Sequence, residues 1–138
     1  MRDDLLVNTF VMKAVSDGYI ILYEADNKRN YVHIQDVAAC FECCIRNFEA
    51  MKNKPYNLGL DSANLSKREL AEKVKEHAGK FEIVCMEIGS DPDKRNYIVS
   101  NERLKKAGFA CSHSLDEGIK ELVKYYKLRS KIDAYRNA

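Results

Sequence analysis

The chain has 138 residues, 46% of them hydrophobic and 32% charged, with a formal net charge of +2. This length supports one domain with a core of its own. The balanced charge, with no basic stripe interleaved with aromatic residues, argues against nucleic acid as a partner, and no apolar run has the length of a membrane span.

The first third of the chain predicts one helix and two short strands. Apolar residues at helical spacing predict a helix over 3–16, with Asp3 or Asp4 as its cap and Gly18 at its end. Residues 19–23, Tyr-Ile-Ile-Leu-Tyr, are β-branched or aromatic for the most part and predict a strand. A polar turn then leads to a second predicted strand over 30–34.

A strand–helix–strand unit is predicted over 31–60. An apolar face with spacings of three and four residues predicts a helix over 36–49, and Asp36 stands where a capping acid belongs. Residues 56–60, Tyr-Asn-Leu-Gly-Leu, predict a strand. The whole unit has the length of a parallel crossover.

The second half of the chain predicts three more helices and a strand. Ser66 and Glu69 have the spacing of a capping box and predict a helix that ends near Gly79. Alternation over 81–86 predicts a strand, and 97–99 predict a brief extended piece. Asn101 is the predicted cap of a short helix, and Ser114 of a long final one whose polar end begins at residue 127.

The cysteines indicate a reducing compartment. There are five, at positions 40, 43, 44, 85 and 111, and three of them crowd into one predicted helix. An odd, clustered set predicts free thiols in a cytoplasmic protein, and residues 1–5 lack the apolar region of a signal peptide. No second C-x-x-C or histidine pair accompanies Cys40-x-x-Cys43, so we predict no metal site there, only small side chains that pack the helix against a sheet.

Four motifs follow one another along the chain. They are Arg29-x-Tyr31-Val32-x-Ile34-x-Asp36-Val37, Tyr56-Asn57-Leu58-Gly59, Ser66-x-x-Glu69-Leu70-Ala71, and a C-terminal run from Ser100-Asn101-x-x-Leu104-x-x-x-Gly108-Phe109 to Ser114-Leu115-x-x-Gly118-Ile119. In this order they resemble the extended short-chain dehydrogenase/reductase family, whose members epimerise, dehydrate or reduce nucleotide sugars. The resemblance runs from about Leu5 to Tyr126.

The resemblance implies an α/β fold, namely the C-terminal lobe of such an enzyme. It implies short strands, about five helices, and a remnant of the Rossmann sheet made of one crossover helix and the last strand. Residues 1–138 are then expected to be a single substrate-binding domain from a longer NAD(P)-binding enzyme whose cofactor half is absent from this chain.

The resemblance also implies substrate-binding residues. Arg29 falls on the family's phosphate-contacting arginine, and a guanidinium is a planar, permanently charged fork that suits phosphate oxygens. Asn57 offers a neutral amide at a predicted strand end. Arg95 is a further candidate, because Ser90 stands where many relatives have the arginine of an R-x-G-D segment. Asn8 is a fourth candidate.

Structural alternatives stay open for these residues. Arg29 could form a loop ion pair with Glu24 or Asp26, and Arg95 could pair with Asp91 or Asp93. Asn57 could be a turn residue. His33, on a predicted strand with apolar neighbours, is predicted to be a packed, hydrogen-bonded histidine, and Asp36 a helix cap.

The catalytic half of the family pattern is missing. The six glycines, at 18, 59, 79, 89, 108 and 118, form no G-x-x-G-x-x-G loop, and no tyrosine is followed by lysine four residues later. We therefore predict no catalytic residue here and no cofactor bound by this chain alone, with NAD or NADP in the longer enzyme.

Two hypotheses for function follow. The first is the nucleotide-sugar-binding portion of an NAD(P)-dependent epimerase, dehydratase or reductase, with a nucleotide-diphosphate sugar as its ligand. The alternative is a stand-alone binding or assembly module that kept the lobe without the chemistry. In either case an exposed strand over 56–60 predicts self-association through its edge, or a local rearrangement of these residues.

Overall fold

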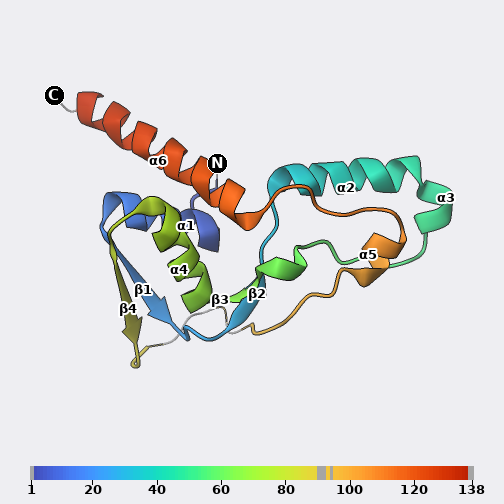
Figure 1. The fold of residues 1–138 in the computed structure, drawn as a ribbon, viewed down its shortest axis with the longest axis horizontal. Coiled ribbons are helices and arrows are strands. Elements are labelled where there is room, and N and C mark those ends of the chain that lie inside the picture. Colours follow the sequence, from blue (N-terminus) through green and yellow to red (C-terminus); the bar gives the residue numbers. More distant parts are fainter. Residues whose placement is uncertain (1, 90–92, 94, 137–138) are drawn as a thin grey trace.

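The computed structural model describes residues 2–89, 93 and 95–136, with the side chains up to residue 132. The chain forms a compact body and an arm that extends from it (Figure 1). The helices and strands of the body are α1 (Leu6–Ser16), β1 (Tyr19–Tyr23), β2 (Lys28–Asn30), β3 (Asn64–Ser66), α4 (Lys67–Ala78), β4 (Glu82–Met86) and α6 (Leu115–Arg136). The arm holds α2 (Ile34–Arg46), α3 (Phe48–Met51) and α5 (Glu102–Lys106), and a 3₁₀ turn, η1 (Asp61–Ala63), leads back to the body.

The body is built on a parallel pair of strands, β1 and β4, in which Ile20 lies beside Ile83. Along β1, Ile20 and Leu22 are buried, whereas Tyr19, Ile21 and Tyr23 face outward. This period of two is what the sequence predicted for a strand with one covered face. The strands predicted at 19–23 and 81–86 are therefore confirmed.

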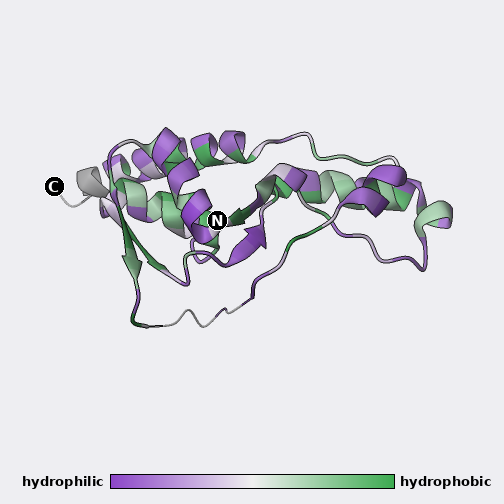
Figure 2. Ribbon diagram, turned by 60° about the horizontal axis from the view of Figure 1, so that its bottom comes forward, coloured by the Kyte–Doolittle hydropathy of each residue, from purple (hydrophilic) through white to green (hydrophobic). Residues whose placement is uncertain are grey.

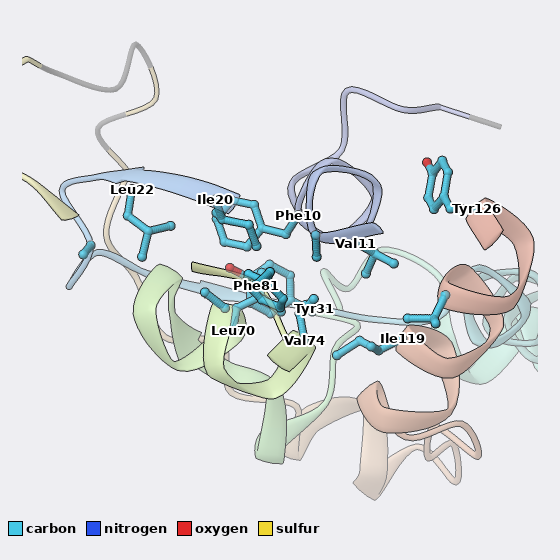
Figure 3. Packing of buried hydrophobic residues seen from close by; sticks show 14 of the residues in the cluster. Phe10, Val11, Ile20, Leu22, Tyr31, Leu70, Val74, Phe81, Ile119 and Tyr126 are labelled. Carbon is cyan, nitrogen blue, oxygen red and sulfur yellow. The ribbon is translucent and has the colours of Figure 1, made fainter. Parts of the chain in front are cut away.

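Helices α1 and α4 pack against β1, and α6 packs against both of these helices. The core that they share with β1 appears in Figure 3, where Phe10 and Val11 of α1, Leu70 and Val74 of α4, and Ile119 of α6 converge. Their aliphatic and aromatic area is withdrawn from water, which supplies the main stabilisation of the fold.

The strand predicted over 30–34 lies earlier in the chain. Strand β2 covers Lys28–Asn30 and pairs antiparallel with β3, with Arg29 opposite Leu65. Helix α2 already begins at Ile34, and its N-cap is His33, whose ring accepts a hydrogen bond from the backbone N–H of Gln35 at 3.2 Å. The prediction that Asp36 caps this helix is wrong, because Asp36 lies inside its first turn.

The strand predicted over 56–60 is absent from the described structure. Side chains satisfy its backbone in place of a neighbouring strand. The Asn30 carboxamide bonds both the N–H and the C=O of Leu60, at 3.1 and 2.6 Å, and the Cys111 thiol donates to the carbonyl of Gly59 at 3.4 Å. The crossover unit predicted over 31–60 is therefore not formed, and the alternative of a local rearrangement fits these side-chain bonds. Self-association of the chain stays a prediction.

Helix starts follow the predicted caps in the second half of the chain. Ser66 and Glu69 form a full capping box, and Ser114 and Glu117 bond each other's backbone N–H in the same way. At the start of the chain the prediction is less accurate, because α1 begins only at Leu6. The carboxylate of Asp3 accepts hydrogen bonds from Tyr126 and Arg129 of α6 instead.

Within the described residues, no helix combines the length and the apolar character that crossing a membrane requires.

Candidate functional site

Arg29 is buried at the junction of β2 with the segment that follows β4. Only 6% of its surface is exposed. Its guanidinium donates to the backbone carbonyls of Lys28 and Asp93, at 2.9 and 2.8 Å, and lies 3.1 Å from the Asp93 carboxylate. The ring of Tyr97 lies 5.5 Å from the guanidinium carbon, within cation–π range. Burial on β2 therefore fixes the direction of this cation.

The alternative of a loop ion pair between Arg29 and Glu24 or Asp26 is wrong. Asp26 pairs with Arg68 at 3.4 Å, and the carboxylate of Glu24 accepts from Asn27 at 3.0 Å.

Arg95 approaches the same carboxylate from the other side. Its Nε and one terminal nitrogen donate to the two oxygens of Asp93, at 2.7 and 2.6 Å, in a bidentate fork. Hydrogen bonds from Arg95 hold the pKa of Asp93 well below its usual range. Two guanidinium groups therefore converge on one anion. Asp91, the other predicted partner of Arg95, and Ser90, the position aligned with the relatives' arginine, lie outside the described residues.

Asn57 lies elsewhere, in the arm. Its side-chain amide donates to the carbonyl of Ser100 at 3.3 Å. It lines an open hollow of about 470 Å³ together with Pro55, Ser100, Glu102, Arg103 and Lys106. The hollow carries two cations, Arg103 and Lys106, beside one acid.

Asn8 belongs to neither place. It lies on α1 and donates to the backbone carbonyl of Arg2 at 2.7 Å. Of the four predicted binding residues, the structure thus brings Arg29 and Arg95 together and leaves Asn57 and Asn8 apart from them.

Asp36 holds a cluster that the sequence analysis missed. It is 1% exposed, and its carboxylate accepts from the backbone N–H and hydroxyl of Ser112 and from the backbone N–H and Nδ1 of His113, at 3.0–3.1 Å. Burial raises the pKa of Asp36, but hydrogen bonds from His113 and Ser112 outweigh it and lower the pKa to about 2. The polar run Ser112-His113 before the cap Ser114 was the available signal.

The two histidines of this cluster stack. The rings of His33 and His113 lie 4.6 Å apart, and His33 also bonds Glu121 of α6 at 3.2 Å. His33 is therefore a packed and hydrogen-bonded side chain, as predicted. The cluster joins the first turn of α2 to α6, and so attaches the arm to the body.

Metal ligation finds little support among the described residues. Glu76, His77 and Asp116 have ligand atoms within 4.8 Å of one another, but Lys73 lies 3.2 Å from Asp116 and supplies a positive charge of its own. All five cysteines are free. Burial raises the pKa of Cys40 to about 11, so it stays a thiol, and it packs with Met51 and Leu104 inside the arm and not against a sheet.

The chain's own residues do not fit a nicotinamide dinucleotide. That cofactor needs closely spaced glycines at a helix start, whereas the six glycines are scattered from position 18 to 118. In the described helices, the first turns are led by Leu5, His33, Asn47, Ser66 and Asn101 as N-caps, none of them part of a glycine loop.

No family model matches the sequence. Solved structures do resemble it. The NAD complex of dTDP-glucose 4,6-dehydratase from Bacillus anthracis superposes with a TM-score of 0.74 at 20% identity, over 95% of this chain and 42% of that one. UDP-glucose 4-epimerase from Thermotoga maritima, with UDP-glucose, gives 0.72 at 24% identity, over 91% and 40%.

A third neighbour performs another reaction. GDP-mannoheptose C4 reductase from Campylobacter jejuni, with NADP bound, gives a TM-score of 0.66 at 21% identity, over 88% of this chain and 43% of that one. The chain thus spans less than half the length of each of these three structures. The likeness confirms the α/β fold that the sequence motifs implied.

Proposed function

We propose that this chain is the nucleotide-sugar-binding portion of an NAD(P)-dependent epimerase, dehydratase or reductase, and that turnover requires a cofactor-binding portion beside it. The observation that carries this proposal is the convergence of Arg29 and Arg95 on one anion. A diphosphate needs cations that stay charged and donors that are already aimed. Asp93 holds both arginines in that arrangement.

Burial makes Arg29 the stronger of the two binding groups. Its backbone partners, the carbonyls of Lys28 and Asp93, limit the directions that its guanidinium can take. Such preorganisation lowers the entropic cost of binding an anion. Arg95 is exposed and supplies a second charge on the same Asp93 carboxylate.

Helix α2 supports the need for a further portion. Ile34, Phe41 and Ile45 have the spacing of one face of α2 and are 68–74% exposed, and Phe48, the first residue of α3, is 60% exposed. Apolar side chains gathered in this way are ordinarily covered. In Figure 2 this part of the arm shows green stretches along α2. We propose that the cofactor-binding portion, with NAD or NADP, covers this face.

The free thiols bear on the cellular compartment in which the protein works. Five free cysteines support a reducing environment, so we propose that the protein works in the cytoplasm.

The first test is calorimetric binding of UDP-glucose, dTDP-glucose and a GDP-hexose to the purified chain and to Arg29→Met. Loss of a buried charged fork should weaken binding of the best ligand by about tenfold to a hundredfold. Arg46→Met is the matched control, because Arg46 forms an exposed pair with Glu42 on α2 and should leave affinity unchanged. Equal binding by wild type and Arg29→Met contradicts the proposed site.

A second test separates the proposal from a stand-alone binding or assembly module. The DNA upstream of the region that encodes this chain should continue the reading frame through a glycine-rich loop and a Tyr-x-x-x-Lys pair. A separate gene with neither motif favours the stand-alone module.

A further inference from the structure

Helix α6 presents a stripe of lysines to solvent. Lys120, Lys124, Lys127 and Lys131 follow one another at spacings of four, three and four residues, so they lie along one side of the helix. All four line a groove of about 370 Å³, which also includes His77 of α4 and the apolar side chains of Val123 and Leu128. The stripe spans about 16 Å at the rise of an α-helix.

The charge of this stripe is not neutralised within the described part of the chain. None of the four lysines takes part in an ion pair there, although exposed acids and bases pair at many other places on the surface. Glu117 and Glu121 lie within one helical turn of Lys120 and Lys124, but Glu117 bonds the backbone and hydroxyl of Ser114 and Glu121 bonds His33. They therefore offset only part of the charge at the N-terminal end of the stripe. Neighbouring lysines one helical turn apart repel one another, which an anionic partner would relieve.

The groove also has an apolar component. Val123 is 7% exposed and forms its floor, whereas Leu128 is 53% exposed at its side. Ile132, four residues after Leu128, is 54% exposed. A partner that carries both carboxylates and apolar side chains at helical spacing therefore forms ion pairs and apolar contacts with this surface.

We propose that this groove docks an acidic amphipathic helix from a partner protein, whose carboxylates meet the lysines while its apolar side chains cover Val123 and Leu128. This inference does not depend on the proposed function, because it uses no residue of the arginine site.

The lysine side chains of the groove favour an acidic helix over other anionic partners. Lysines are point charges without the bidentate fork that suits phosphate, so they fit carboxylates spaced along a helix. The lining residues include no aromatic ring on which a nucleic-acid base could stack. The surface is a groove between two helices, whereas a bilayer presents a plane.

The test uses fluorescence anisotropy with a labelled peptide of about four helical turns, in which glutamates and leucines alternate at helical spacing. Its twin carries lysine in place of each glutamate. The acidic peptide should bind the chain and the lysine twin should not. Affinity should fall steeply between about 50 and about 500 mM salt, because exposed charges are screened.

The matched variants remove equal charge from two places. Lys124→Gln with Lys127→Gln should weaken binding about three- to tenfold. Lys52→Gln with Lys54→Gln, at the far end of the arm, should leave affinity unchanged, since these exposed lysines lie outside the groove. Circular dichroism confirms that both double variants are folded.

Three results would overturn the inference. One is equal loss of affinity in both double variants, because the attraction would then be a matter of net charge. Another is stronger binding of vesicles rich in phosphatidylserine than of the acidic peptide. The third is stronger binding of a single-stranded oligonucleotide.

Discussion

At the scale of the residue, Asp36 shows how a local sequence rule can assign a residue the wrong role. An acid that precedes an apolar helical pattern is commonly a cap. Here His33 takes that place, and the Asp36 carboxylate receives four hydrogen bonds from Ser112 and His113, 76 and 77 residues further on. A contact at such separation has no periodic signal in the sequence.

Replacing Asp36 should therefore affect stability strongly. Asp36→Ala leaves the backbone N–H groups of Ser112 and His113 without this acceptor, and we expect it to lower the free energy of unfolding by about 2–4 kcal/mol. Urea denaturation measures the change. Asp61→Ala is a control, since that acid is exposed and its loss should cost less. A change below that of the control contradicts the role of Asp36.

The same contact sets a pH dependence. Because the folded state lowers the pKa of Asp36 from 3.8 to about 2, its contribution is present above pH 3.8 and is lost as the pH falls through 2. The hydrogen bond to Asp36 raises the pKa of His113 above 6.5, so its contribution is present below pH 6.5 and is lost as the pH rises through the folded value. The free energies of unfolding of wild type and Asp36→Asn should thus differ most between pH 3.8 and pH 6.5, where both contributions are present.

Gly59 is a second residue whose role depends on packing. A Cβ there would overlap the carboxamide of Asn30, which bonds both backbone groups of Leu60. Gly59→Ala should displace Asn30 and destabilise the fold by about 1–3 kcal/mol, as overpacking typically does. Thermal unfolding measures this, with Gly118→Ala as a control because its Cβ would meet only one ring atom of His33. Equal melting temperatures for the two variants argue against the overlap.

At the scale of the element, the sequence predicts best where the signal is local. The capping boxes at Ser66 and Ser114 need only a serine and a glutamate three residues apart, and both helices start there. The β1 and β4 strands were evident from their alternation and side-chain types. Residues 56–60 have the composition of a strand but no strand beside them, so their backbone bonds side chains instead.

The candidate site was predictable only in part, for the same reason. The motif marks Arg29, but its partner Asp93 lies 64 residues away. Arg95 could be matched to Asp93 because they are neighbours in sequence. Nothing local indicated that Asn57 and Asn8 would lie away from the two arginines.

At the scale of the whole molecule, one face of α2 is buried and the other is exposed. On one face Cys40 packs with Met51 and Leu104 and holds the arm together. On the other, Phe41 and Ile45 are 68% and 74% exposed. The arm thus resembles a surface prepared for another portion of protein.

Variants on the two faces should behave differently. Phe41→Ser with Ile45→Ser should change the free energy of unfolding by less than about 0.5 kcal/mol, since the side chains are exposed, and should reduce binding of a hydrophobic fluorescent dye. Cys40→Ser, on the buried face, should lower stability by about 1–2 kcal/mol and leave dye binding of the folded chain unchanged. Strong destabilisation by the exposed pair would show that this face is already packed.

The pairing of β1 with β4 also constrains how the chain can fold. Tyr19 lies beside Glu82, and the Tyr126 hydroxyl reaches Asp3 across 123 residues. Contacts between residues this far apart in sequence require long loops to close. The entropic cost of closure is incurred before the contacts stabilise the chain, and this slows folding. During synthesis α1 would therefore wait, with its apolar face uncovered, until α6 has left the ribosome. Helix α6 therefore completes a core whose other helices, α1 and α4, precede it in the chain.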